Sequence, residues 1–272
     1  MKPWLELCRA AAGDVAAGLA RLGSRDERER AHGTGVGGDE TAEVDVVAET
    51  AVLARLEALH SRGVSFHLVS EELGERTFGA APTWWVVVDP IDGSVNAKRG
   101  LPYYSLSVAV ATGPTMADVV FGFVKDLASG EEWVAERGRG ARLNGAPLRD
   151  RPKEPIELLA LEATTAPLMA RALPALAPHA ARIRVMGSLA LALCHLAAGR
   201  LDAVASLRPV RSVDVAAAQL LLREQGSAIV QVDGSTLDGC GLDLGVRPWI
   251  VAAATPAGCR PLAAALVDGT PG

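Results

Sequence analysis

The chain has 272 residues, 49% of them hydrophobic, and a formal net charge of −5 at pH 7. This length suits one large domain or two closely packed ones. Because the balance is acidic and no stretch is dense in Lys or Arg, a nucleic-acid partner is not expected, and small-molecule chemistry is favoured. The four cysteines lie far apart without a CxxC pair, which argues against a disulfide framework or a zinc cluster and fits a reducing compartment.

No segment predicts a membrane span or a secretion signal. None reaches the roughly 18 to 20 uncharged apolar residues that cross a bilayer. The N-terminal stretch MKPWLELCRAAAGD carries Glu6, Arg9 and Asp14 where a signal peptide needs an uninterrupted apolar region. We therefore expect a cytoplasmic protein with no membrane partner.

Two helices separated by a loop are expected before residue 60. Apolar residues from Leu5 to Leu22 recur at three- and four-residue spacing, which predicts an amphipathic helix of about five turns. A charged and then glycine-rich stretch follows without an apolar period and predicts a mobile loop, with four glycines between Gly33 and Gly38. The helical pattern resumes from Val44 to Leu59.

Strands dominate the next segment of the chain. SFHLVS predicts a short strand that leads to Glu71, and TWWVVVD predicts a central strand buried on both faces because its residues do not alternate. YYSLSVAVA, ADVVFGFVKD and EEWVAERG predict further strands, and Asn144-Gly145 predicts a tight turn beyond them. Strands in succession without intervening helices indicate an antiparallel or mixed sheet.

After about Pro155 short apolar strands alternate with helical stretches, which is the pattern of an α/β layer. The chain contains no internal repeat and no low-complexity linker. We therefore predict two halves, residues 1–153 and 154–272, that share one interface rather than two tethered domains.

The stretch VVVDPIDGSVN, residues 86–96, carries the strongest chemical signal. Asp89 stands where a predicted strand ends, and Pro90 is expected to turn the chain out of the strand. Ligands of open α/β sheets gather at the carboxyl ends of strands. The oxygens of Asp89, Asp92 and the Ile91 carbonyl would suit Mg²⁺. The alternative is an ordinary turn, because DP and DG are common turn dipeptides.

Three further residues extend this interpretation. Gly93 leaves its N–H open to a ligand, and if Ser94 begins a short helix, the first amides of that helix form an anion site. Glu71 follows a strand as Asp89 does, although a Glu-Glu pair is often only a solvated helix start. Asp214 lies in the first turn of the helix predicted for VDVAAAQLLLREQG, where an Asp often only complements the helix dipole.

VSEELGE, WVVVDPIDGSVN and VDVAAAQLLLREQG together resemble the three signature segments of the inositol monophosphatase family. This is a magnesium-dependent, lithium-sensitive phosphatase superfamily that includes fructose-1,6-bisphosphatase. The match extends to FVKDLASGEEWVAERGRGARLNGAPL and covers nearly the whole chain from about residue 40. The resemblance implies mixed α/β and α+β structure in an αβαβα layered sandwich, and a homodimer.

The resemblance also implies a ligand set for two or three Mg²⁺ ions, with Mn²⁺ as an alternative ion. Glu71, Asp89 and the Ile91 carbonyl look like the ligands of the first ion. Asp89, Asp92 and Asp214 look like those of the second, and many members bind a weaker third ion near Glu71.

The catalytic residues implied by the resemblance are Glu71, Ser94 and Asp45. Glu71 and the Ser94 hydroxyl would position the attacking water, and Asp45 is the matching carboxylate that would orient that hydroxyl. Most members have Thr in place of Ser94. The amides of Gly93 and Ser94 would hold the phosphate.

Substrate residues are expected at Asn96, Gly187, Ser188, Arg208 and Arg211. Gly187-Ser188 matches a family turn that contacts the substrate, but it could also be a plain helix N-cap. Arg208 and Arg211 favour a ligand with a second anionic or polyhydroxylated end, the alternative being that they pair with surface acids. These arginines and the glycine-rich loop look like the archaeal-type branch, whose members often hydrolyse inositol 1-phosphate and fructose 1,6-bisphosphate.

The sequence thus predicts a Mg²⁺-dependent phosphatase that cleaves inositol monophosphate and related sugar phosphates by attack of a metal-activated water. Three alternatives stay open. The main activity could be that of a fructose-1,6-bisphosphatase, the substrate could be 3′-phosphoadenosine or histidinol phosphate, or the chain could be a regulatory binding protein.

Overall fold

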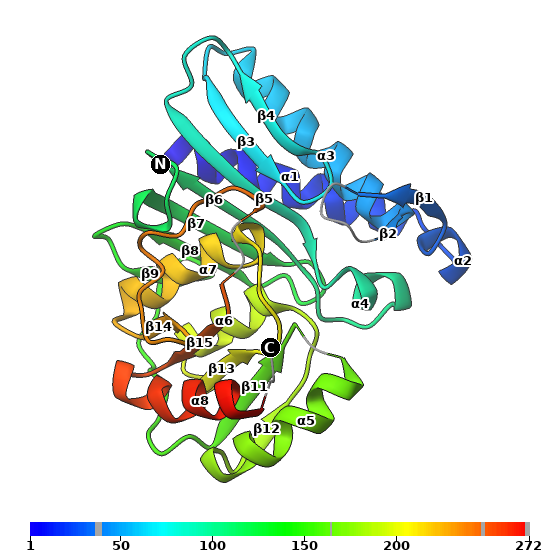
Figure 1. The fold of residues 1–272 in the computed structure, drawn as a ribbon. Helices are drawn as coiled ribbons and strands as arrows, with labels where there is room; N and C mark the ends of the chain where they lie inside the picture. The colour runs from blue at the N-terminus through cyan, green and yellow to red at the C-terminus, as the bar shows by residue number, and fades with distance from the viewer. Residues whose placement is uncertain (36–39, 164, 246–247, 270–272) are drawn as a thin grey trace.

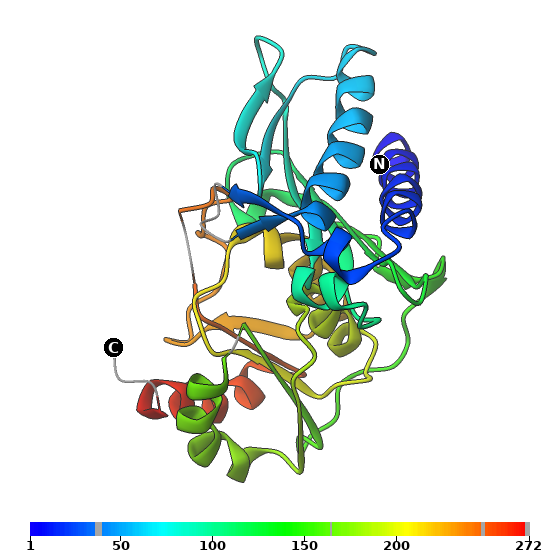
Figure 2. The same cartoon turned by 90° about the vertical axis from the view of Figure 1, so that its right-hand side faces the viewer.

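The computed structural model describes residues 1–35, 40–163, 165–245 and 248–269. Its elements form five layers: a helix pair, a large sheet, a second helix pair, a smaller sheet and a third helix pair (Figures 1 and 2). Three hydrophobic clusters fill the spaces between successive layers. The predicted αβαβα sandwich is therefore confirmed.

The first helix layer consists of α1 (Lys2–Ala20) and α3 (Glu43–His60), which lie side by side on one face of the large sheet (Figure 2). Both helices were predicted. Between them lie α2 (Arg25–Arg28) and an antiparallel strand pair, β1 (Ala31–Thr34) and β2 (Glu40–Ala42). The prediction of a loop without secondary structure is wrong for these residues, and residues 36–39 lie outside the described ranges.

The large sheet has eight strands in the order β10-β9-β8-β7-β6-β5-β3-β4. Only β3 and β5 pair in parallel, so the sheet is mixed, as predicted. Asn144 and Gly145, both with positive φ, form the expected turn before the edge strand. The strands are β3 (Phe66–Ser70), β4 (Gly74–Phe78), β5 (Trp84–Asp92), β6 (Ser105–Ala111), β7 (Val119–Asp126), β8 (Glu132–Glu136), β9 (Ala141–Leu143) and β10 (Ala146–Pro147).

Strand β5 is buried on both faces because Val86 and Val88 pack against the first helix layer and Val87 packs against the middle one. Its end differs from the prediction. Asp89 pairs with Ser107 and Asp92 pairs with Ser105, with a register irregularity between them. A strand accepts Pro at such a bulge, where no ladder hydrogen bond is needed. The chain therefore passes through a bulge at residues 90–91 instead of leaving the sheet at Asp89.

The smaller sheet has five strands in the order β12-β11-β13-β15-β14, with β11 parallel to both of its neighbours. This arrangement confirms the predicted α/β layer of the second half. Its strands are β11 (Leu158–Glu162), β12 (Arg182–Arg184), β13 (Ala203–Ser206), β14 (Ala228–Gln231) and β15 (Ile250–Ala253). Helices α5 (Ala166–Leu176) and α8 (Pro256–Gly269) cover its outer face (Figure 1).

The middle layer consists of α6 (Leu189–Ala197) and α7 (Ser212–Gln225), and it packs against both sheets. Nearly every residue of α6 is buried, which explains why its sequence LALALCHLA is apolar except at His195. All four cysteines are free and buried, consistent with the absence of a disulfide framework. Within the described ranges, the helices are too short or too polar to cross a membrane.

Candidate active site

Three carboxylates from distant segments meet between the first sheet and the middle helices. Glu71 directly follows β3, and β3 pairs in parallel with β5, so that Ser70 lies opposite Val88, the neighbour of Asp89. Asp214 is the third residue of α7. One oxygen of each of these carboxylates lies within 4.8 Å of the others. The sequence prediction that these segments converge is therefore met for Glu71, Asp89 and Asp214.

This acidic group is largely shielded from solvent. Asp89 is 1% exposed, and the side chains of Glu71 and Asp214 are 15% and 14% exposed. Burial, partly offset by a nearby guanidinium, raises the pKa of Glu71 to about 8. Burial and the charges of Glu71, Asp92 and Asp214 raise the pKa of Asp89 well above its ordinary value. Buried like charges this close favour a cation among them, and hard carboxylate oxygens suit a divalent ion.

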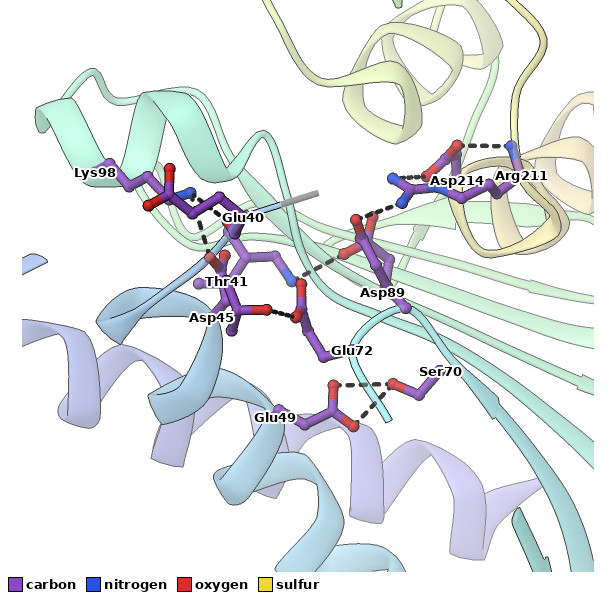
Figure 3. Close-up of polar contacts among 12 residues, drawn as sticks. Glu40, Thr41, Asp45, Glu49, Ser70, Glu72, Asp89, Lys98, Arg211 and Asp214 are labelled. Atoms are coloured by element: carbon purple, nitrogen blue, oxygen red, sulfur yellow. Dashed lines mark hydrogen bonds and ion pairs between the residues drawn. The ribbon is translucent and has the colours of Figure 1, made fainter. Parts of the chain in front are cut away.

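The nearby guanidinium belongs to Arg211 (Figure 3). Its Nη1 lies 2.7 Å from Oε1 of Glu71, and its Nη2 lies 3.5 Å from Oδ1 of Asp214. The backbone N–H of Arg211 also donates to Oδ2 of Asp214, at 2.8 Å, and so caps α7. Sequence reasoning placed Arg211 on the substrate side, but the structure places its side chain inside the acidic group.

Asp92 has a different set of partners. Its Oδ2 accepts hydrogen bonds from the Ser188 hydroxyl at 2.5 Å and from the Ala190 N–H at 2.7 Å, both at the start of α6. Burial and the charge of Asp214 raise its pKa to about 7. Asp92 thus lies beside Asp214 but ties the first half of the chain to the second.

Gly93 and Ser94 begin α4 (Ser94–Arg99), as predicted. Gly93 has φ of 93°, and a Cβ there would lie 2.9 Å from the Gly187 carbonyl oxygen and 3.0 Å from that of Tyr103. Glycine is therefore needed for the close approach of two backbones as well as for the turn. Among the residues that the structure describes, the Ser94 hydroxyl has no hydrogen-bond partner.

The predicted contact between Asp45 and Ser94 is thus not formed. Asp45 lies in the first turn of α3, where its Oδ2 accepts the Ala42 N–H at 2.8 Å. The same oxygen lies 3.4 Å from Nζ of Lys98 (Figure 3). Sequence reasoning missed Lys98, whose place one turn beyond Ser94 on a short helix was the available signal.

The residues expected to contact substrate mostly hold a loop in place. The Asn96 side-chain amide donates to the carbonyl oxygens of Tyr103 at 2.8 Å and of Met186 at 2.7 Å. The Glu162 carboxylate accepts the N–H groups of Met186 at 3.1 Å and Gly187 at 2.8 Å. Burial raises the pKa of Glu162 to about 8 in spite of these donors. Glu162 was missed, although it ends β11 much as Asp89 was expected to end β5.

A cleft of about 370 Å³ opens beside the acidic group, a size suited to a small ligand. Arg208 was expected there, but it is exposed and does not line the cleft. Within the described part of the chain it forms no hydrogen bond or ion pair. The polar residues that line the cleft are Asp92, Asn96, Glu162, Arg211 and Asp214.

Two more carboxylates, Glu72 and Glu49, lie near the group and were given no role in the sequence analysis. Glu72 accepts a hydrogen bond from the Thr41 hydroxyl at 2.5 Å, and burial raises its pKa. Glu49 accepts the Ser70 hydroxyl at 2.8 and 2.9 Å, and burial raises its pKa to about 7 (Figure 3). Both carboxylates are paired with hydroxyl groups rather than with cations in these contacts.

Comparison with known proteins agrees with this geometry. The model of the inositol monophosphatase family matches residues 2–268. The chain is 35% identical over 229 residues to a fructose-1,6-bisphosphatase/inositol-1-monophosphatase of Methanothermobacter thermautotrophicus, covering 80% of each protein. It is 38% identical over 203 residues to a protein of the same name from Thermococcus kodakarensis, covering 74% of this chain and 73% of the relative.

The fold also matches solved structures. A crystal structure of an inositol monophosphatase-fructose 1,6 bisphosphatase superposes with a TM-score of 0.82 and 28% sequence identity, covering 96% of this chain and 99% of the other. Together with the acidic group and the layered fold, the matches leave one conclusion. The chain belongs to the inositol monophosphatase family and is a phosphoric monoester hydrolase.

Proposed function

We propose that this enzyme is a Mg²⁺-dependent phosphatase that hydrolyses inositol monophosphate and related sugar phosphates, including fructose 1,6-bisphosphate. The observation that carries the proposal is the meeting of Glu71, Asp89 and Asp214 beside a cleft lined with polar groups. The two archaeal relatives are named for both activities, which supports this substrate class.

The chemistry of the oxygen donors fits the proposed ions. Glu71, Asp89 and Asp214 would hold Mg²⁺ or Mn²⁺, with Asp92 and the Ile91 carbonyl as further donors for a set of two or three ions. When bound, such ions would reverse the negative charge of the site and make a water nucleophilic near neutral pH.

The protein's own groups would bind and orient the reactants. Glu71 and the Ser94 hydroxyl would position the attacking water, and the Glu71 carboxylate would accept its proton, with Asp45 helping to orient Ser94 if it rotates toward that hydroxyl. The amides of Gly93 and Ser94 would donate to the phosphoryl oxygens. Asn96, Glu162 and Ser188 would fix the loop at Gly187, which forms one wall of the cleft.

Two expectations about the protein in its cell belong to the same proposal. We infer that it forms a homodimer, which light scattering of the purified chain would test. We also infer a cytoplasmic location, for which the four free buried cysteines are the supporting observation.

A substrate panel tests the proposed activity. Release of phosphate would be measured from inositol 1-phosphate, fructose 1,6-bisphosphate, 3′-phosphoadenosine 5′-phosphate and histidinol phosphate, each with Mg²⁺ and with EDTA. We expect the first two to give the highest kcat/KM and EDTA to abolish both reactions, with recovery on adding Mg²⁺. A preference for either of the other substrates would overturn the substrate assignment, and no hydrolysis despite Mg²⁺ binding would favour a regulatory role.

A further inference from the structure

The position of Arg211 suggests a second role for a residue that sequence reasoning assigned to substrate. We propose that the Arg211 guanidinium is an internal cation that competes with the divalent ion for Glu71 and Asp214, so that metal binding displaces it into the cleft. The inference rests on the proposed function, because it takes the acidic group as the metal site.

The contacts make joint occupation unfavourable. Nη1 of Arg211 is 2.7 Å from Oε1 of Glu71, within hydrogen-bond distance, and Nη2 is 3.5 Å from Oδ1 of Asp214. A Mg²⁺ ion would need to lie about 2.0 to 2.1 Å from such oxygens. The guanidinium therefore fills the space on the cluster side of Glu71, and two cations this close would repel each other in a largely buried site.

The side chain can leave without disturbing the helix. The N–H of Arg211, rather than its guanidinium, caps α7 by donating to Oδ2 of Asp214 at 2.8 Å. Arg211 already lines the cleft together with Glu162, whose carboxylate would receive a displaced guanidinium. From there it would also face the anionic end of a bound substrate.

Arg211 would thus occupy two positions, one in the acidic group and one in the cleft. In the metal-free protein, Arg211 would neutralise the acidic group. With metal bound, it would leave Glu71 and extend farther into the cleft, toward the substrate that the sequence analysis expected it to contact. Lys98 does not take the first role, because its ion pair is with Asp45. Elsewhere in the described ranges, the cationic side chains form no ion pair with Glu71, Asp89 or Asp214.

The test measures metal affinity and not catalysis. The full-length chain would be stripped with EDTA and titrated with Mg²⁺ in a calorimeter, and thermal unfolding would be followed with and without the ion. We expect Arg211→Met to bind Mg²⁺ about tenfold more tightly, an effect of about 1.4 kcal/mol. Its metal-free form should unfold several degrees lower, because the buried carboxylates lose their counter-charge.

The matched control is Arg208→Met, which removes the same charge from the same loop at an exposed position and should leave the Mg²⁺ affinity unchanged. Arg211→Lys keeps the charge and should bind Mg²⁺ within about threefold of the native protein, which is about 0.7 kcal/mol. If Arg211→Met fails to fold, Arg211→Gln gives the same comparison with a polar side chain.

The possible outcomes separate the two proposals. Equal or weaker Mg²⁺ binding by both neutral Arg211 variants would overturn the competition while leaving the metal site intact. Asp89→Asn should lose Mg²⁺ binding. If the Asp89→Asn protein binds Mg²⁺ as tightly as the native chain, the acidic group does not hold the metal. That result would overturn the proposed function, and the inference about Arg211 with it.

Discussion

Two sets of buried carboxylates lie within one site, and they differ in what faces them. Asp92 and Glu162 each accept hydrogen bonds from backbone N–H groups between Met186 and Ala190. Glu71, Asp89 and Asp214 instead face one another and the Arg211 guanidinium, and only local N–H groups, those of Ile91 and Arg211, donate to Asp89 and Asp214 within the described ranges. Fixed backbone N–H dipoles stabilise the charge of a buried carboxylate without a further ligand. A group of carboxylates that face one another is stabilised only when a cation lies among them. Asp92 therefore joins the two halves, Glu162 holds the loop at Gly187, and the second set is suited to bind a metal.

Substituting one member of each set gives the largest expected effect. Asp89→Asn should lower kcat/KM by about 10³-fold, which is about 4 kcal/mol. It should also raise the unfolding temperature of the metal-free protein, because one of three crowded charges is removed. Asp92→Asn should likewise lower activity, but it should reduce stability by about 1 kcal/mol, since the hydrogen bonds at α6 lose their charge.

Phosphate release and thermal unfolding in EDTA would measure both effects. The opposite signs of the two stability changes are the critical result. If both variants were stabilised, Asp92 would belong with the crowded carboxylates, and the distinction between the two sets would be lost.

A pH titration extends the test to Glu49, a buried carboxylate that accepts hydrogen bonds from the Ser70 hydroxyl. Burial raises its pKa from 4.5 to about 7. A raised acid pKa means that the folded state binds the proton more tightly than the unfolded state, so stability is lost as pH rises from about 4.5 through 7. Glu49→Gln should remove this loss and exceed the native protein in stability by about 3 kcal/mol at pH 8.

Urea unfolding at pH 5 and pH 8 would measure the difference. At pH 5 the difference should shrink to about 1 kcal/mol. A constant difference at both pH values would mean that Glu49 keeps the same charge across this range.

A comparison of two glycine substitutions tests the junction that Asp92 maintains. Gly93→Ala would place a Cβ 2.9 Å from the Gly187 carbonyl oxygen at φ of 93°. Gly63 has nearly the same φ, 92°, but open space around it. Gly63→Ala should cost about 1 kcal/mol for backbone strain alone, and Gly93→Ala about 2 kcal/mol more because the two halves must separate slightly. Chemical unfolding would compare them, and equal losses would show that the close approach is not tight.

Much of the site could be predicted because its residues lie in local patterns. Glu71 follows a strand, Asp214 lies at a helix start and Asp89 follows the apolar part of β5, and such positions can be predicted from the apolar residues around them. The order of strands and helices predicted only mixed α and β structure, and the layered fold was implied by the family resemblance. The bulge at residues 90–91 was missed because only the pairing of β5 with Ser105 and Ser107 keeps Asp92 in the strand.

Partners across the chain could not be predicted. Arg211 was expected to face the substrate, but its contact with Glu71 joins segments 140 residues apart, and a long side chain can reach either destination. The pairing of Asp45 with Lys98 rather than Ser94 depends on where α4 lies against α3. Strands β1 and β2 were not predicted because they are short and their residues do not alternate between apolar and polar.

The middle helix layer has a consequence for how the protein is made. Helices α6 and α7 come from the second half of the chain, yet they cover the inner face of the first sheet. On the ribosome that sheet emerges first, and its inner face stays exposed to solvent until Ser212–Gln225 has been synthesised. A nascent chain stopped near residue 153 would thus present Val87, Val124 and Trp133 to chaperones.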